Sequence, residues 1–229
     1  MEGLTNWLKQ LNFNGVLDVV LIVAASLLCI IVHETCHGLA AYWMGDDTAK
    51  RAGRLSLNPM KHIDIMGLIM MALFRFGWAK PVPVDMRKFQ KPKLGMAITA
   101  LAGPVSNILL VLVAAVLRLF AIFFSLKYEI AFLEYIVLFF EYIMILSAGL
   151  AIFNLIPVPP LDGSKILFSL LSNRMYMALM KYERFGMLLL MALLITNVID
   201  TPLLYMRGWV LDLAANLTVP LAELLQRLL

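Results

Sequence analysis

Long apolar segments dominate the chain, and their length predicts helices that cross a membrane. Three segments run over 16–44, 95–126 and 130–153, and each reaches the roughly 20 apolar residues that a spanning helix needs. A weaker segment over 185–199 continues through Thr201 and Pro202 towards Tyr205. Residues 201–229 have the pattern of an amphipathic helix at a surface. The chain is therefore predicted to be an all-α polytopic membrane protein with about four to six transmembrane helices.

The stretch between the first two spans is polar and basic, with features of non-helical structure. Polar and apolar residues alternate from Arg54 to Leu57 before Asn58 and Pro59, which predicts a short strand or an interfacial loop. The apolar run over 63–74 has only twelve residues, so the segment 63–78 fits a re-entrant element as well as a span. Prolines then favour an extended backbone up to Val84.

A second irregular element interrupts the third span. Residues 154–163 contain three prolines and end with Asp162 and Gly163, and helix-like sequence resumes at Ser164. Non-helical backbone at membrane depth is tolerated only where it is buried in protein or lines a cavity. The break is therefore predicted to contribute to a site.

Composition supports the membrane assignment and excludes several classes of protein. Hydrophobic residues make up 62% of the chain and charged residues 15%, whereas soluble domains average about 45–50% and 25%. A cytosolic enzyme is thus excluded, and we expect one membrane-embedded domain over 1–229 with its core at about 16–200. The two cysteines, Cys29 and Cys36, share one apolar segment, which excludes a disulfide scaffold.

The distribution of positive charge predicts the orientation in the membrane. Ten of the 19 lysines and arginines lie between Lys50 and Lys93, and basic loops between spans stay on the cytoplasmic side. The net charge of +4 is explained by this loop, so no nucleic-acid partner is expected. The chain is predicted to be a multi-pass protein of the cell membrane, with the far end of its first span at the cytoplasmic side.

That end of the first span carries the clearest chemical signature in the chain. His33, Glu34 and His37 form an H-E-x-x-H pattern on a predicted helix. Residues four apart differ by about 40° in azimuth, so both imidazoles can bind one metal ion, for which zinc is well suited. Glu34 is offset by about 100° and can accept a proton from water. Ionisable groups inside a membrane are costly and functional by default, although a polar patch that joins helices is the alternative.

A catalytic zinc site requires a third protein ligand and one open position. Asp162 is the best candidate because it follows the proline break, and Gly163 permits a close approach. Asp162 could instead cap a helix that starts at Gly163. His62 is expected at a surface or interface. Glu134 and Glu141 lie on one helical face, and their role stays open.

Three motifs, in this order, resemble the site-2 protease family of intramembrane zinc metalloproteases, and the similarity covers roughly 16–200. Residues 53–59 and 77–84 are similar to its compact prokaryotic branch, so no PDZ or CBS domain is expected. The motif residues are His33, Glu34 and His37; Gly103, Pro104 and Asn107; and Asn154, Pro157, Pro159, Pro160, Leu161, Asp162 and Gly163.

The resemblance implies that His33, His37 and Asp162 bind one Zn²⁺ ion, while Glu34 activates water. It further implies that the substrates are membrane-embedded helices, such as anti-sigma factors, transcription-factor precursors or signal-peptide remnants. Proteolysis of these substrates inside the bilayer would be the function. An unwound substrate could pair with the extended segments 54–58 and 154–160.

Two asparagines are candidates for a supporting role. The resemblance implies that Asn154 holds the substrate strand or polarises its carbonyl group, although a backbone cap at the helix break is an equal alternative. For Asn107, a hydrogen bond between helices is favoured over catalysis. Two other functions stay open: a transporter that uses the His/Glu cluster, and a catalytically inactive scaffold. The oligomeric state is not indicated.

Overall fold

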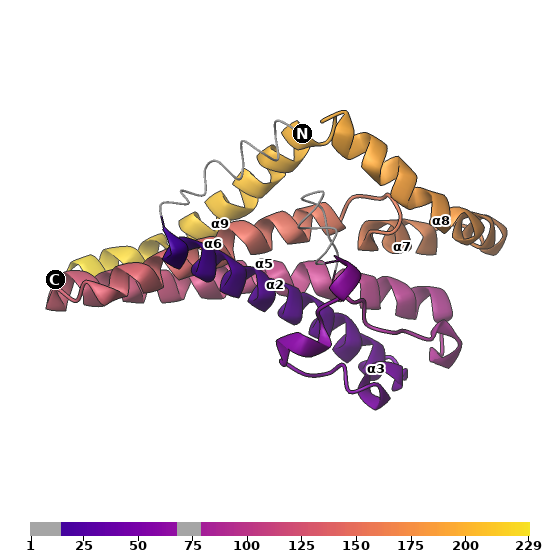
Figure 1. Ribbon diagram of the computed structural model, residues 1–229, viewed down its shortest axis with the longest axis horizontal. Helices are drawn as coiled ribbons and strands as arrows, with labels where there is room; N and C mark the ends of the chain where they lie inside the picture. The colour runs from indigo at the N-terminus through magenta and orange to yellow at the C-terminus, as the bar shows by residue number, and fades with distance from the viewer. Residues whose placement is uncertain (1–14, 68–78) are drawn as a thin grey trace. The chain divides into compact units, whose positions relative to one another are not determined.

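The fold is entirely helical in the part of the chain that the structure covers. A computed structural model describes residues 15–67 and 79–229 (Figure 1), and it contains no β-strand within these ranges. The all-α prediction is therefore confirmed. Most of the segment 63–78, whose spanning or re-entrant character the sequence left open, lies outside the described residues.

Four described helices are long and apolar enough to cross a bilayer. Three of them coincide with the three strong spans that the sequence predicted, with ends that differ by at most a few residues. A 23-residue helix, α8, and four short helices complete the described elements. The long helices are α2 (Val16–Trp43), α5 (Pro92–Tyr128), α6 (Phe132–Asn154) and α9 (Asp200–Gln226); the others are α3 (Thr48–Arg51), η1 (Pro59–Lys61), η2 (Met86–Lys88), α7 (Asp162–Ser169) and α8 (Asn173–Ile195).

The C-terminal helices differ from the prediction. The apolar segment expected to run from 185 towards Tyr205 is divided, because α8 ends at Ile195 and α9 begins at Asp200. Asn197 between them has a φ of 56°, a left-handed conformation that a helix does not continue through. Pro202 lies in the first turn of α9, where its missing N–H is not required. α9 itself has the length and apolarity of a span, in contrast to the surface helix expected for 201–229.

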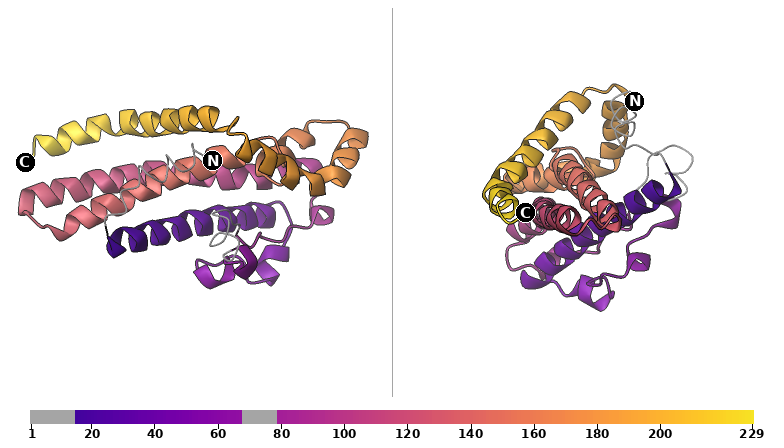
Figure 2. Two further views of the ribbon diagram at one scale, coloured as in Figure 1. Left: turned by 45° about the horizontal axis from the view of Figure 1, so that its top comes forward. Right: turned by 90° about the vertical axis from the view of Figure 1, so that its left-hand side faces the viewer.

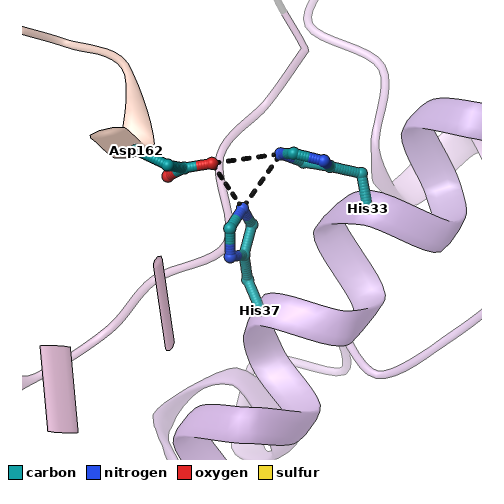
Figure 3. A group of neighbouring side chains, drawn as sticks. All are labelled: His33, His37 and Asp162. Carbon is teal, nitrogen blue, oxygen red and sulfur yellow. Dashed lines mark hydrogen bonds and ion pairs between the residues drawn. The ribbon is translucent and has the colours of Figure 1, made fainter. Parts of the chain in front are cut away.

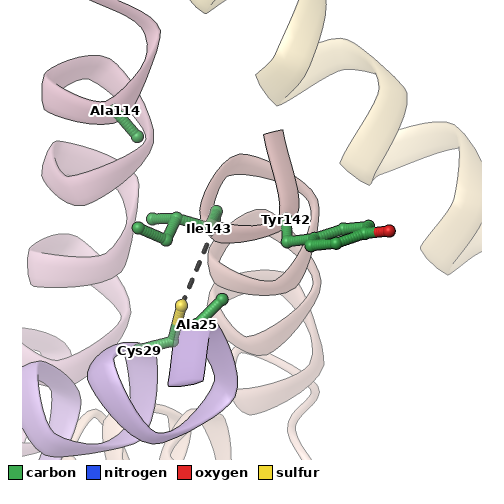
Figure 4. Packing of buried hydrophobic residues seen from close by; sticks show 5 residues of the cluster. All are labelled: Ala25, Cys29, Ala114, Tyr142 and Ile143. Atoms are coloured by element: carbon green, nitrogen blue, oxygen red, sulfur yellow. Dashed lines mark hydrogen bonds between the residues drawn. The ribbon is translucent and has the colours of Figure 1, made fainter. Parts of the chain in front are cut away.

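The chain folds into two compact units, and α2 and α5 contribute residues to both. The first unit contains 15–29, 107–153 and 188–229. Its core joins Ala25 and Cys29 of α2 to Ala114 of α5 and to Tyr142 and Ile143 of α6 (Figure 4). The small residues on α2 and α5 let the helices approach closely.

Two polar contacts join α5 to α6, which lie side by side within this unit (Figure 2). The hydroxyl group of Ser147 donates to the main-chain carbonyl of Asn107 at 3.1 Å. Arg118 donates to the Glu141 carboxylate at 3.2 Å. The role of Glu141, which the sequence left open, is thus that of an ion-pair partner of Arg118. Glu134 lies in the first turn of α6.

Among the described residues, the second unit contains 30–67, 79–106 and 154–187, and in it a buried carboxylate connects the end of α2 to the segment before α5. Gly45, with a φ of 106°, turns the chain after α2. Asp46 is fully buried; its Oδ1 accepts the Thr48 N–H at 2.9 Å, and its Oδ2 accepts the Asp85 N–H at 2.6 Å. Burial raises the pKa of the Asp46 carboxyl, but the hydrogen bonds from Thr48 and Asp85 outweigh it and hold the pKa below its usual range.

Asp46→Asn is expected to destabilise the protein at neutral pH by about 1–3 kcal/mol, because an amide NH₂ placed at Oδ2 cannot accept the Asp85 N–H. The folded state lowers this pKa, so the contribution of Asp46 is complete above about pH 4 and is lost as the pH falls further. Thermal unfolding in detergent at pH 7 and at pH 3 should show a difference between wild type and variant that shrinks in acid.

Asp47→Asn is the matched control, since Asp47 pairs with Arg51 and Lys88 on the surface, where ion pairs contribute little. An Asp46 variant that unfolds no earlier than the Asp47 variant at neutral pH would contradict the anchoring role of Asp46.

Candidate metal centre

Two imidazoles and one carboxylate converge on a single point in the second unit (Figure 3). His33 and His37 lie on consecutive turns of α2, and their Nε2 atoms are 3.0 Å apart. The Oδ2 atom of Asp162, the first residue of α7, lies 3.2 Å from Nε2 of His33 and 3.0 Å from Nε2 of His37. All three residues are at least nine-tenths buried. The structure thus brings together the three residues that the sequence suggested as metal ligands.

The spacing and chemistry of these atoms fit a zinc ion. Four ligands at the usual zinc bond lengths of about 2.0–2.1 Å stand roughly 3.3 Å from one another, close to the separations observed here. His37 is also oriented as a ligand, because its Nδ1–H donates to the Thr99 carbonyl at 2.7 Å. That bond places the proton on Nδ1 and leaves the Nε2 lone pair for a metal. The set of two imidazoles and one carboxylate is one that zinc enzymes use.

Asp162 reaches this point because the chain leaves the helix after Asn154 and enters α7 at Asp162. Leu161 is the N-cap of α7, and the Asp162 side chain makes its contacts with the histidines, so the alternative of Asp162 as the cap is wrong. A Cβ on Gly163 would lie less than 3.0 Å from the main-chain carbonyls of Leu155 and Ile156. Only glycine permits this approach, which places Asp162.

Gly103 of α5 gives the two imidazoles their space. A Cβ at this position would lie less than 3.0 Å from the rings of both His33 and His37. The Gly103–Pro104 pair lies inside α5, where glycine lets another element approach the helix closely. The second sequence motif is therefore in direct contact with the first.

Glu34 faces the same cavity as the three candidate ligands. Its Oε2 atom accepts the Val82 N–H at 3.0 Å, which holds the carboxylate against the segment 79–84, a stretch without regular secondary structure. The cavity has a volume of about 280 Å³ and is also lined by Asn154. Glu34 and Asn154 are thus placed where they can contact a molecule bound beside the three ligand atoms.

Two other predicted candidates lie elsewhere. His62, which the sequence placed at a surface or interface, is buried instead, and its Nε2 contacts the Ser56 carbonyl at 2.7 Å; it is not one of the three converging residues. Asn107 belongs to the first unit, and it does not line the described cavity. Its main-chain carbonyl accepts the Ser147 hydroxyl, but its buried side-chain amide has no hydrogen-bond partner among the described residues, so the interhelical bond that the sequence favoured for this side chain is not found there.

Three residues at the site were missed by sequence reasoning. Thr99 and Val82 contact His37 and Glu34 through main-chain atoms, and such contacts leave no signature in the side-chain pattern. Lys165 lines the cavity, and its Nζ lies 3.8 Å from Oδ1 of Asp162. Its position three residues after Asp162 on a helix could have indicated this pair.

Comparison with known proteins agrees with this geometry. A family model described as "Peptidase family M50" matches residues 21–196. The chain belongs to this family. The resemblance to site-2 proteases is therefore confirmed, and the protein is a zinc metalloprotease by family.

Curated relatives of this M50 peptidase carry names of the same kind. "Putative zinc metalloprotease YwhC" of Bacillus subtilis is 37% identical over 76% of this chain and 80% of its own length. "Putative zinc metalloprotease Rip2" is 29% identical in Mycolicibacterium smegmatis and 26% identical in Mycobacterium tuberculosis, over 90% of this chain and 77% and 78% of their lengths. No solved structure matches the chain significantly.

Gly103→Ala is expected to weaken zinc binding at least about tenfold, because the added Cβ would push both imidazoles out of position. Zinc affinity of the purified M50 peptidase, measured by competition with a chelator, tests this. Gly149→Ala in α6 is the control, since the nearest atom to its added Cβ is 3.9 Å away. Equal zinc affinity of the two variants would show that Gly103 does not support the site.

Proposed function

We propose that this protein is an intramembrane protease that hydrolyses peptide bonds in membrane-spanning substrates, in the manner of regulated intramembrane proteolysis. The observation that carries the proposal is the convergence of His33, His37 and Asp162 beside a cavity that also contains Glu34. A buried ligand set next to a carboxylate base is the arrangement that metal-assisted hydrolysis requires.

His33, His37 and Asp162 would hold one Zn²⁺ ion, which would supply a Lewis acid able to lower the pKa of water and polarise a carbonyl. Glu34 acts as general base and accepts the proton of the attacking water. The same carboxylate then delivers this proton to the leaving amine nitrogen. The N–H of Val82 keeps the Glu34 carboxylate at the cavity wall throughout.

Asn154 is placed to orient the substrate. This residue lines the cavity at the end of α6, and an amide NH₂ can donate to the carbonyl of an extended peptide. The alternative role as a backbone cap at the helix break is compatible with the same position. The carbonyl that is cleaved must be released from the substrate helix, because helical carbonyls are already hydrogen-bonded.

Pro81, Val82 and Val84, in a segment without regular secondary structure, line the cavity. Of the two stretches expected to pair with substrate, 154–160 contributes Asn154 and Pro160 to the lining, and 54–58 contributes no residue. Residues 54–58 form a loop, and 154–160 are helix end and turns. In the segment 81–84, Pro81 and Pro83 have no N–H, and the Val82 N–H is bonded to Glu34. A substrate strand at this wall would therefore bind mainly through carbonyls that accept its N–H groups.

We further propose a multi-pass position in the cell membrane, with the active site near the cytoplasmic side. Four helices have the length and hydropathy of spans, and the basic residues between Lys50 and Lys93 favour that orientation. The expected partners are the lipid bilayer and transmembrane-helix substrates. The distribution of charge gives no reason to expect nucleic acid.

Glu34→Gln should slow cleavage of a single-span test substrate by about 10²–10⁴-fold while zinc is retained. The amide preserves size but cannot accept a proton, and general acid–base steps contribute about 10²–10⁴-fold. Wild type and variant are compared in liposomes, with zinc quantified in the same preparations.

Asp162→Ala should lose metal and activity together, whereas His62→Ala should retain zinc. Efficient cleavage by zinc-loaded Glu34→Gln would refute the role of the base. A wild type that moves metal ions or protons across liposomes and cleaves nothing would support a transporter instead, and an inert wild type would support an inactive scaffold.

A single cysteine at Lys91, in a chain whose Cys29 and Cys36 are replaced, reports the orientation. We expect modification only by maleimides that enter the cell, because the basic loop is placed inside. Modification of intact cells by a membrane-impermeant maleimide would contradict the orientation and the cytoplasmic-side active site.

A further inference from the structure

Arg54 is a buried arginine in the second unit whose partners are main-chain carbonyls. Only 6% of its surface is exposed. Its Nη1 donates to the Lys61 carbonyl, and its Nη2 donates to the carbonyls of Lys80 and, at 3.3 Å, of Pro81. No carboxylate pairs with Arg54 among the residues that the structure describes. Burying a charged group costs free energy unless hydrogen bonds compensate. We therefore expect the function of the Arg54 guanidinium to lie in the carbonyl groups that it binds.

The carbonyl of Pro81 and the N–H of Val82 belong to the same peptide group. Arg54 binds its oxygen end at 3.3 Å, and Glu34 accepts its hydrogen end at 3.0 Å. Because a peptide group is planar and its C=O and N–H point in opposite directions, a rotation that breaks one contact also breaks the other. A guanidinium at one end and a carboxylate at the other polarise the group and strengthen both bonds.

The same guanidinium also fixes the chain on either side of this peptide group. It joins the Lys61 carbonyl to that of Lys80, and the Lys80 N–H donates to the His62 carbonyl at 2.9 Å. The loop that ends at His62 and the segment that begins at Ala79 are thus held together at Arg54. Arg54 thus holds this peptide group directly through the Pro81 carbonyl, and it holds the chain beside it through the carbonyls of Lys61 and Lys80.

We propose that Arg54 is a positioning residue that sets the orientation of Glu34 through the Pro81–Val82 peptide group. The inference rests on the proposed function, in which Glu34 is the general base. Arg54 does not contact the reacting atoms. It fixes the Val82 N–H, which holds the Glu34 carboxylate at the cavity.

The first test is independent of activity. Pro81 and Pro83 have no amide hydrogen, so Val82 supplies the only exchangeable amide in 81–83. In Arg54→Met, hydrogen exchange at the Val82 amide, resolved by mass spectrometry with fragmentation, should be at least about tenfold faster than in wild type. Arg51→Met is the matched control, because the Arg51 side chain is 76% exposed. It should leave this exchange unchanged.

The second test uses cleavage of the single-span substrate. Arg54→Met should lower kcat by about 10–100-fold through misplacement of the base, with KM changed by less than about threefold and zinc content unchanged. Arg54→Lys should recover part of kcat, since an ammonium group keeps the charge but cannot reach all three carbonyls as a planar fork does. In a Glu34→Gln background the further loss caused by Arg54→Met should be smaller than in wild type.

The proposal would be overturned if the Val82 amide exchanged at the same rate in Arg54→Met as in Arg51→Met. It would also be overturned if Arg54→Met raised KM and left kcat unchanged, or if it lowered kcat by the same factor in wild type and in the Glu34→Gln background. If Arg54→Met does not fold, Arg54→Lys decides the question by the same measurements. If the wild type cleaves no substrate, the proposed function fails, whereas the exchange measurement still decides whether Arg54 holds the peptide group.

Discussion

Three ligand atoms from distant parts of the chain stand within 3.2 Å of one another in buried surroundings, and the second unit is organised around that close approach. The histidines require only a helix, because four residues return to the same face. The carboxylate requires much more: the helix must end at Asn154, and the start of α7 must pass against the Leu155 carbonyl. Gly163 is the residue that allows this passage.

Close approach also explains the glycine in α5. The imidazoles occupy the volume that a side chain at Gly103 would fill, and Thr99, one turn earlier on the same helix, orients His37 through its carbonyl. α5 thus contributes space and one acceptor to the site, and no ligand. The space that Gly103 leaves for the imidazoles explains why the α5 motif, which has no metal-binding side chain, accompanies the H-E-x-x-H pattern.

The segment 79–88 illustrates how an apolar protein holds irregular backbone in place. Its middle is bonded to Arg54 and to Glu34, and its end is bonded to the buried carboxylate of Asp46. Each of these charged groups satisfies main-chain donors or acceptors that a helix would have paired internally. The Glu34 carboxylate is therefore positioned by a backbone that buried charged groups hold in place.

The sequence was sufficient to predict the three strong spans, the paired histidines and the contribution of Asp162, because each depends on periodicity, a break in it or residue chemistry. The sequence was not sufficient where the structure depends on main-chain conformation or on main-chain contacts. The turn at Asn197 depends on a local left-handed conformation. The alternation at 54–57 left a short strand or an interfacial loop open, and the loop is what forms, with Arg54 bound to carbonyls and Leu55 close to Gly38 of α2. The contacts of Thr99 and Val82 run through main-chain atoms that every residue has.

The central claim is that His33, His37 and Asp162 hold one zinc ion. X-ray absorption at the zinc edge of the purified protein tests it directly. The account predicts one ion per chain with only nitrogen and oxygen neighbours at about 2.0–2.1 Å, and with the scattering pattern of two imidazoles. A sulfur neighbour at about 2.3 Å, from Cys29 or Cys36, or a shell with a third imidazole, which only His62 could supply, would contradict it.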